Sequence, residues 1–327
     1  MKKIDGVQPI SGFRLDCYRN ALLPALRFFN KDIRPFLLAK IGKYQYDKTL
    51  DFVEIELMRY NMAFKYIGIG NRYFNTSSET IKKDICDFVD KKVLVIVYLD
   101  TYYYPHFPAS YNKFHSRHGV LVHGYDWEKN VFYLVDTDFI ESFEYKNIVI
   151  PMENVVYAHE KMVEHFKMRN YVETIENFSE NRKSFFEDYV RFYTNYFISN
   201  YDCFVESINK LQYFVECFGL DLNCEETAMK YVPQLFISLN RVINCRHLMY
   251  YSYSCVFKGV EDILHHLEIL LDDYNYVRSV MYKSYYSKQY RSVSFEKCYE
   301  IMKRIVIQEK ELHHNILEYF QKYVVIV

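Results

Sequence analysis

Three residue types that cooperate in nucleophilic catalysis follow one another along this chain of 327 residues. Cys17 opens a segment with helical spacing, His118 begins a strand-like run, and Asp136 lies at the end of the next run. A cysteine attacks as a thiolate, and the N–H groups at a helix N-terminus stabilise that negative charge. A histidine then accepts the thiol proton while a third group orients the histidine. The order Cys, His, Asp therefore predicts nucleophilic catalysis through sulfur.

The histidine and the aspartate belong to two runs that together predict a β-hairpin. The stretch SRHGVLVHGYD at 116–126 alternates like a buried strand, and VFYLVDTD at 131–138 follows it closely. Gly124, Asp126 and Asn130 supply the turn signals between the two runs. Because Cβ atoms of cross-strand neighbours lie about 4.5–5.5 Å apart, a hairpin here would bring a histidine and an aspartate together.

Two positions of this hairpin have competitors. Successive side chains of a strand point to opposite faces, so only one of His118 and His123 can face Cys17. The alternation gives these two faces: His118, Val120, Val122 and Gly124 on one, and Gly119, Leu121, His123 and Tyr125 on the other. The composition of the faces does not decide between the histidines. At the end of the second run, Asp138 shares the parity of Asp136 and competes with it.

The elements that must position these residues are an N-terminal helix and an antiparallel sheet. DCYRNALLPALRFFN at 16–30 has apolar residues at helical spacing. Asp16 is its expected N-cap, and Pro24 is expected to kink the helix or to end its first part. The expected strands lie between about 90 and 151: KKVLVIVYLD, RHGVLVHGYD, NVFYLVDTD and YKNIVIP.

The second half of the chain has helical instead of strand-like patterning. From about residue 157 nearly every segment has helical period, as in VEDILHHLEILLDDYNYVRSVMYK at 260–283, and turn breakers are few. We therefore expect an α+β fold, with an N-terminal helix packed on an antiparallel sheet over residues 1–156 and an all-helical domain over residues 157–327. The apolar, aromatic helices are compatible with homo-oligomers.

Composition narrows the choice of partners and compartment. Lys+Arg (41) and Asp+Glu (42) nearly cancel, which argues against a nucleic-acid or anionic-membrane partner. No run approaches the roughly 18 apolar residues of a membrane span, and the N-terminus lacks the apolar core of a signal peptide. The eight cysteines include no CxxC pair, as expected of reduced thiols. A cytoplasmic protein is predicted.

No motif for a metal or an organic cofactor stands out. The helical pairs His265/His266 and His313/His314 do not form HExxH, and adjacent histidines on a helix diverge by about 100°. Glu261 and Glu268 have helical spacing from the first pair without completing a ligand set. P-loop, GxGxxG and GxSxG motifs are missing from the sequence. We expect neither a metal nor a cofactor.

A series of motifs within 93–138 is more specific. An Asp-x-Tyr-Tyr-x-Pro stretch precedes a histidine, then a strand that ends in Gly-Tyr-Asp, then a strand that ends in aspartate. The residues concerned are Asp100, Tyr102, Tyr103, Pro105, His118, Gly124, Tyr125, Asp126 and Asp136, together with Cys17, Ala21 and Leu22 near the N-terminus. This series resembles the N-terminal domain of the butirosin-biosynthesis-protein-H-like family, over roughly residues 8 to 155.

The resemblance implies a papain-like cysteine fold related to C39-type peptidases. It implies Cys17 as the nucleophile, His118 as the general base and then acid, and Asp136 as the carboxylate that orients the histidine. Asp100, Tyr102 and Tyr103 belong to a loop that either lines a substrate groove or covers the sheet. The glutamine that papain-like enzymes place shortly before the nucleophile is replaced by Ser11, and Gln8 lies further upstream. The backbone N–H of Cys17 is thus the only oxyanion donor that the sequence names.

The function that the resemblance implies is acyl transfer in the biosynthesis of nonribosomal-peptide, polyketide or aminoglycoside-type natural products. An acyl group would pass from the thioester of an acyl- or peptidyl-carrier protein, through Cys17, to a small amine. Two alternatives remain open. A cysteine peptidase or amidase would use the same triad with water as the acceptor, and a non-catalytic module would use the fold to bind a carrier protein.

Overall fold

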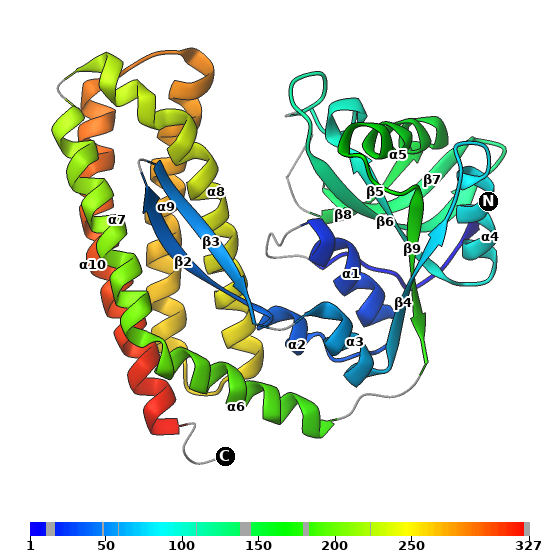
Figure 1. Cartoon of the computed structure of the whole chain (residues 1–327), viewed down its shortest axis with the longest axis horizontal. Helices are drawn as coiled ribbons and strands as arrows, with labels where there is room; N and C mark the ends of the chain where they lie inside the picture. The colour runs from blue at the N-terminus through cyan, green and yellow to red at the C-terminus, as the bar shows by residue number, and fades with distance from the viewer. Residues whose placement is uncertain are drawn as a thin grey trace. The chain divides into compact units, whose positions relative to one another are not determined.

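The computed structural model describes residues 1–10, 17–47, 49–57, 59–108, 110–137, 145–178, 183–222 and 224–323. Figure 1 shows the chain, which divides into two compact units. The first, here called the sheet unit, consists of Met1–Phe36 and Arg59–Lys183. The second, the helical unit, consists of Leu37–Met58 and Ser184–Val327. Each unit is described below by itself.

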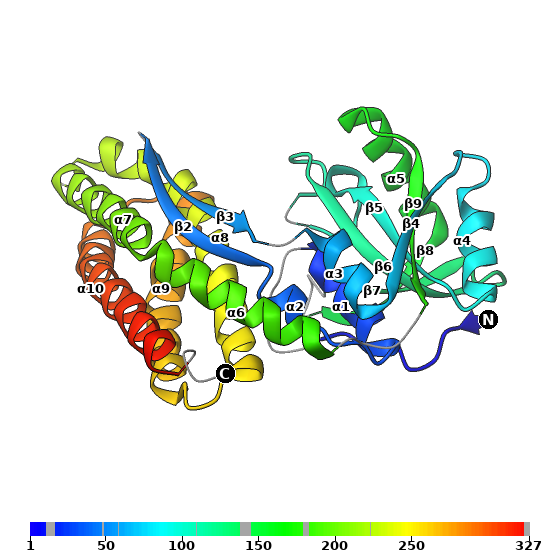
Figure 2. The ribbon, with the colours of Figure 1, turned by 60° about the horizontal axis from the view of Figure 1, so that its bottom comes forward.

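The described part of the sheet unit contains a seven-stranded antiparallel sheet. Its strand order is β4-β9-β5-β6-β7-β8, and β1 pairs with β6 beside this path. Figure 2 shows β4, β9 and β5 side by side. The strands are β1 (Lys2–Lys3), β4 (Ile69–Asn75), β5 (Leu94–Asp100), β6 (Arg117–Asp126), β7 (Val131–Thr137), β8 (Tyr145–Pro151) and β9 (Tyr171–Asn177). The four strands that the sequence predicted are β5 to β8, and their antiparallel pairing is confirmed.

Helices cover this sheet and fill the space around it. They are α1 (Cys17–Phe28), α2 (Arg34–Leu37), α3 (Tyr60–Ile67), α4 (Ile81–Asp90) and α5 (Met152–Phe166), and a 3₁₀ turn, η1 (Thr101–Tyr103), follows β5. Every residue of α1 from Arg19 to Leu26 is buried. Pro24 lies inside α1, which continues to Phe28. The sequence predicted a kink or an end there, and the continuation to Phe28 rules out the end, because burial of the whole stretch holds the helix together although proline removes one backbone hydrogen bond.

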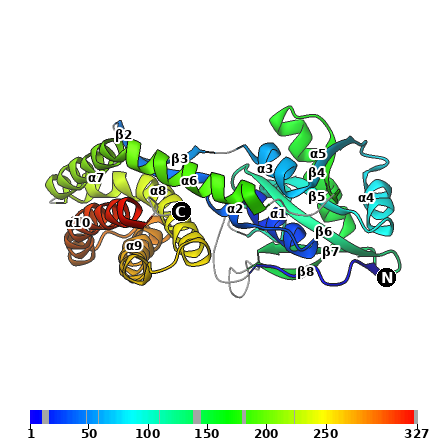
Figure 3. The ribbon, with the colours of Figure 1, turned by 90° about the horizontal axis from the view of Figure 1, so that it is seen from below.

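The helical unit combines long helices with one β-hairpin. The helices are α6 (Lys183–Ser199), α7 (Tyr201–Asp221), α8 (Glu225–Val256), α9 (Glu261–Ser287) and α10 (Ser292–Tyr323). Strands β2 (Lys40–Asp47) and β3 (Thr49–Glu56) form the hairpin, which packs on α7 and α8. Figure 3 shows α9 and α10 side by side. A Cβ at Gly42 would lie 2.3 Å from the ring of Phe52 and 2.9 Å from Cys245 Sγ, so only glycine lets this hairpin approach α8 so closely.

The division of the chain differs from the one expected. The predicted boundary between 156 and 157 falls inside α5, which packs on β5 and β8 of the sheet unit. Strand β9 lies between β4 and β5, so the sheet unit extends to Lys183. Residues 37–58 belong instead to the helical unit. Local periodicity gave no sign of these pairings because each joins segments that lie far apart in the sequence.

Candidate active site

A histidine and an aspartate meet at one end of the paired strands β6 and β7. His118 Nε2 lies 2.6 Å from Asp136 Oδ1, and His118 and Asp136 are 5% and 0% exposed. The register pairs Leu121 with Val135, so the position opposite Asp136 is Val120 and His118 lies two residues further along β6. Such diagonal neighbours are within reach of long side chains. The hairpin thus brings the two predicted residues together.

The carboxylate of Asp136 is held on both of its oxygens. The backbone N–H of Thr137 donates to Oδ1 at 2.7 Å, and the hydroxyl of Tyr104 donates to Oδ2 at 3.2 Å. The ring of Phe107 meets the ring of His118 edge-on, with centroids 5.4 Å apart. Because Asp136 cannot rotate without losing these bonds, the imidazole plane of His118 is fixed as well.

The charge of His118 depends on its neighbours. Burial lowers its pKa, but the charge and hydrogen bond of Asp136 outweigh burial, and a hydrogen bond to the Cys17 side chain adds to them, so the pKa rises from 6.5 to about 10. Nε2 is engaged by Asp136, which leaves Nδ1 for the sulfur. Cys17 itself is half-buried and is the first residue of α1. The site therefore places the imidazole of His118 between a carboxylate and the sulfur of Cys17 at a helix N-terminus.

Two more side chains lie close to Cys17 that the sequence did not indicate. Burial raises the pKa of Tyr145 strongly, with additions from the charges of Asp136 and Cys17, and hydrogen bonds with Thr137 and Asn20 act in the opposite direction. The hydroxyl of Tyr145 thus keeps its proton and can donate a hydrogen bond. Asn20 is one helical turn after Cys17, a spacing that signals the same helix face. Tyr145 is the first residue of β8, and none of the sequence motifs discussed above includes it.

The three residues expected at the substrate have other contacts. Asp100 caps η1 by accepting a hydrogen bond from the N–H of Tyr102 at 3.0 Å, and its second oxygen is 2.7 Å from His115 Nδ1. Tyr102 stacks on His115 with ring centroids 4.4 Å apart. Tyr103 packs against Tyr157 of α5 at 5.5 Å. Within the described residues these contacts join Asp100 and Tyr102 to His115 and Tyr103 to α5, and none of them reaches Cys17. Their neighbour Tyr104 is the one that touches the site.

The second histidine of the hairpin lies outside this site. His123 is the extra residue of a β-bulge, because Val122 pairs with Leu134 while Gly124 pairs with Tyr133. Adjacent residues of β7 face opposite sides, so Gly124 does not share a face with Val122, contrary to simple alternation. His123 is fully buried, and its burial together with the charge of Lys3 lowers its pKa to about 4. It stays neutral at physiological pH.

Some predicted features fall outside the described residues. These are the N-cap Asp16, the oxyanion position Ser11 and the competing carboxylate Asp138. Of the two carboxylates considered in VDTD, the structure therefore describes Asp136 alone. Within the described ranges, three or more histidine, cysteine, aspartate or glutamate side chains nowhere gather in a way that could hold a metal ion. His313 is buried against the carbonyl of Glu309, and His265 is exposed near Glu268.

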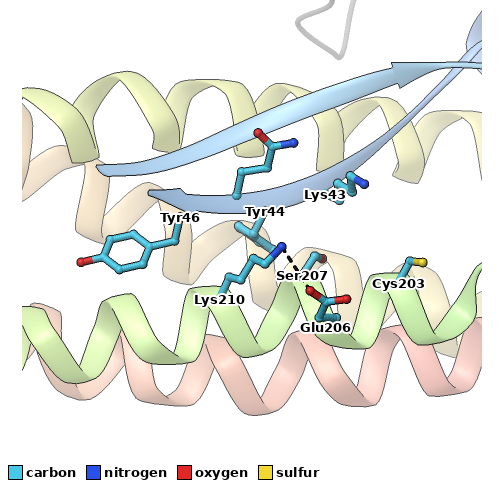
Figure 4. Close-up of a pocket in the computed structure, with 8 residues that line it drawn as sticks. Lys43, Tyr44, Tyr46, Cys203, Glu206, Ser207 and Lys210 are labelled. Carbon is cyan, nitrogen blue, oxygen red and sulfur yellow. Dashed lines mark ion pairs between the residues drawn. The ribbon is translucent and has the colours of Figure 1, made fainter. Parts of the chain in front are cut away.

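A separate pocket lies in the helical unit, between β2 and α7 (Figure 4). It has a volume of about 270 Å³ and includes an ion pair between Lys210 and Glu206 at 3.3 Å. Its lining consists of Lys43, Tyr44, Gln45, Tyr46, Cys203, Glu206, Ser207 and Lys210. None of the residues expected to carry chemistry lines it.

Comparisons with known proteins did not identify a family for this chain. No protein-family model matches the chain, and no curated protein matches it either. Among the helices that the structure describes, none has the length and apolarity needed to cross a membrane. The chemistry of the site thus rests on Cys17, His118, Asp136 and the side chains around them.

Proposed function

We propose that this protein is a cysteine-dependent acyltransferase of papain-like fold, with Cys17 as nucleophile, His118 as acid and base, and Asp136 as the orienting carboxylate. The observation that carries the proposal is the buried imidazole of His118, held by Asp136 on one side and hydrogen-bonded to Cys17 on the other. The motif series in 93–138, with its resemblance to the butirosin-biosynthesis-protein-H-like family, supports a carrier-protein thioester as the donor and an amine as the acceptor.

The first half-reaction moves the acyl group onto the protein. The proton of the Cys17 thiol resides on His118, and the thiolate attacks the carbonyl carbon of the donor thioester. A new C–S bond forms to Cys17 and the C–S bond to the carrier breaks. The leaving thiolate takes the proton from His118, so the products are an acyl-Cys17 thioester, a neutral imidazole and the free carrier thiol. Exchange of one thioester for another is nearly isoenergetic, so catalysis consists of activating the nucleophile.

The second half-reaction releases the product. A neutral amine attacks the acyl carbon, His118 accepts the proton that the nitrogen loses, and a C–N bond forms. The C–S bond to Cys17 breaks, which restores the thiolate beside the imidazolium. Water in place of the amine would give a free acid by the same path, which is the hydrolase alternative. Asp136 stabilises the imidazolium in both halves.

Negative charge develops on the carbonyl oxygen in each half-reaction. The backbone N–H of Cys17 is one donor for it, since a helix N-terminus leaves such groups unpaired. The hydroxyl of Tyr145 is a second, because it keeps its proton, is hydrogen-bonded to Asn20 one turn after Cys17, and interacts electrostatically with Cys17. This donor replaces the glutamine that papain-like enzymes place before the nucleophile.

The environment of the cysteines supports a reducing compartment. All eight cysteines are free thiols in the structure, and a catalytic thiolate must remain reduced to act. The proposal includes a cytoplasmic location, where a carrier-protein thioester would also be available. The steps of this mechanism use neither a metal ion nor an organic cofactor.

The decisive experiment follows acylation of the protein by mass spectrometry. Incubation with an S-acyl-N-acetylcysteamine, a small stand-in for the carrier thioester, should add one acyl group, which peptide mapping places on Cys17. Cys17→Ala should not be acylated, whereas Cys203→Ala, which removes an exposed cysteine of the helical unit, should behave like the parent. Unchanged transfer by Cys17→Ala would refute the proposal. Loss of the adduct at equal rates with and without added amine would favour the hydrolase.

A further inference from the structure

A buried carboxylate lies close to Cys17 without belonging to the triad. Glu173 is on β9 and is 0% exposed. Its Oε1 accepts hydrogen bonds from the Tyr18 hydroxyl at 2.8 Å and from Asn71 Nδ2 at 2.9 Å, and its Oε2 accepts one from the Tyr98 hydroxyl at 2.5 Å. Every partner donates, which is the arrangement that suits an ionised carboxylate.

The donors around Glu173 are all neutral groups. Burial raises the pKa of Tyr18 and of Tyr98, and the charge of Glu173 raises both further, so these phenols keep their protons. In the described part of the chain, no lysine, arginine or histidine lies within ion-pair distance of Glu173. A buried carboxylate without a counter-charge is costly to the fold, because hydrogen bonds replace only part of its hydration.

Tyrosine rings surround this charge and continue to the surface. Tyr18 lies 5.3 Å from Tyr60, Tyr73 lies 5.0 Å from Tyr171, and Tyr98 lies 5.8 Å from Tyr171, measured between ring centroids. Tyr73 is 58% exposed, so the cluster reaches solvent there. We call these five residues the tyrosine rim. Aromatic faces attract cations, and a phenol that donates a hydrogen bond to a carboxylate has a more electron-rich ring.

The tyrosine rim adjoins the nucleophile through the chain itself. Tyr18 is the residue after Cys17, and its hydroxyl binds Glu173 directly. Tyr98 pairs with Gly119, so its side chain lies on the face of the sheet opposite to that of His118. A ligand held at the exposed side of the rim would therefore be coupled to the nucleophile through Tyr18, which follows Cys17 on α1 and is hydrogen-bonded to Glu173.

We propose that Glu173 and the tyrosine rim form a binding site for an organic ammonium group. The ammonium rests against the exposed faces of Tyr73 and Tyr171, and the negative charge of Glu173 beneath them supplies the counter-charge. In the reaction, a role that rests on the proposed function, this site holds a charged group of the acceptor. The nitrogen that attacks must be neutral, so it is not the one held here.

Binding can be measured without any acyl donor. Saturation-transfer NMR at pH 7 with butylamine, which is charged, and butan-1-ol, its neutral counterpart, should show butylamine bound at least tenfold more tightly to the parent protein. Glu173→Gln removes the charge and keeps one acceptor oxygen, which can serve either Tyr18 or Tyr98 in their present positions. It should weaken butylamine binding about tenfold and leave butan-1-ol unchanged. Equal binding of the two probes to the parent would overturn the proposal.

Two further variants separate ligand binding from a structural role of Glu173. Tyr73→Leu removes the exposed ring together with a hydrogen bond from Asn71, and should weaken butylamine binding several-fold. Tyr18→Phe breaks the link to α1 but leaves the charge and the ring, so butylamine should still bind. If Glu173→Gln and Tyr18→Phe both slow acylation of Cys17 while butylamine binding stays unchanged, Glu173 holds α1 in position and does not bind a cation. Cys17→Ala should bind butylamine like the parent, so failure of acyl transfer would not affect this result.

Discussion

The Nε2 atom of His118 and the Oδ1 atom of Asp136 are 2.6 Å apart, and solvent reaches only 6% of the histidine side chain and none of the aspartate. Such a short, buried contact between a ring nitrogen and a carboxylate keeps the Nε2–H group of His118 directed at Asp136. The other nitrogen is thereby assigned to Cys17, whose side chain is hydrogen-bonded to this histidine. Contact with Asp136 thus sets both the charge of His118 and the orientation of its imidazole ring.

Asp136→Asn tests the orienting carboxylate. The amide has the size of the carboxylate but carries no charge, so the imidazolium loses its counter-ion. We expect transfer from an S-acyl-N-acetylcysteamine to fall by about 10²–10⁴, as for orienting aspartates in other triads. Asp126→Asn is the matched control, since Asp126 lies at the far end of β6 and bonds to the backbone N–H groups of Glu128 and Lys129. A loss below threefold in Asp136→Asn would contradict the assigned role.

The raised pKa of His118 predicts how stability depends on pH. A folded-state value of about 10 against 6.5 means that the pair contributes fully below about pH 6.5 and is lost as pH rises towards 10. Each pKa unit corresponds to about 1.4 kcal/mol, so the contribution is at most about 5 kcal/mol.

Urea unfolding at pH 6.5 and 9.5 checks this, followed by the fluorescence of Trp127, the only tryptophan, which lies in the sheet unit. The destabilisation caused by His118→Gln should be smaller at pH 9.5 by several kcal/mol. A pH-independent difference between the two proteins would mean that His118 is neutral in the folded state.

The elements that carry the three candidate residues could be predicted from the sequence for a physical reason. A helix that begins at Cys17 and a hairpin that carries His118 and Asp136 are local patterns, visible in spacing and turn residues, whereas the choice of His118 over His123 and of Asp136 over Asp138 came from the family resemblance. Tyr104 and Tyr145 could not be found in this way, because they reach Asp136 and Cys17 from a loop and from the start of another strand. The bulge at His123 was also missed, since it depends on how β6 pairs with β7.

The fold, like the site, could be predicted where it depends on local sequence patterns. Strands that follow one another along the chain gave hairpin signals, whereas β9 enters the sheet between β4 and β5 after a long excursion. The hairpin of β2 and β3 has strand-like alternation but packs on helices that come much later in the sequence. Its membership of the helical unit depends on contacts such as that of Gly42 with Phe52 and Cys245. Spacing within the hairpin sequence does not reveal these contacts.

Tyr145→Phe tests the second oxyanion donor. Removal of the hydroxyl takes away one hydrogen bond to the developing negative charge, so acylation of Cys17 should slow by about 10- to 1000-fold while binding of the donor changes little. Tyr103→Phe is the control, because this ring packs on Tyr157 and has no described contact with Cys17. The measurement is the rate of acyl-enzyme formation at saturating donor. Equal rates for Tyr145→Phe and the parent would assign Tyr145 to packing alone.

A buried ion pair in the helical unit provides a prediction about stability. Arg246 Nη2 lies 2.7 Å from Glu309 Oε2, and both side chains are fully buried. The hydroxyls of Tyr44 and Tyr274 donate to Glu309 Oε1 at 2.5 Å and 2.6 Å. The carboxylate thus joins the β2–β3 hairpin to α8, α9 and α10 through one group.

Glu309→Gln removes the charge and keeps a side chain that can accept from the tyrosines. It leaves Arg246 as a buried cation without a counter-charge, which should cost about 3–5 kcal/mol in the free energy of unfolding. Glu300→Gln, on the exposed face of the same helix, breaks only a surface pair with Lys303 and should leave stability unchanged. Urea unfolding followed by circular dichroism of the helices measures both. If Glu309→Gln costs no more than Glu300→Gln, Arg246 finds other partners and the ion pair does not hold the hairpin in place.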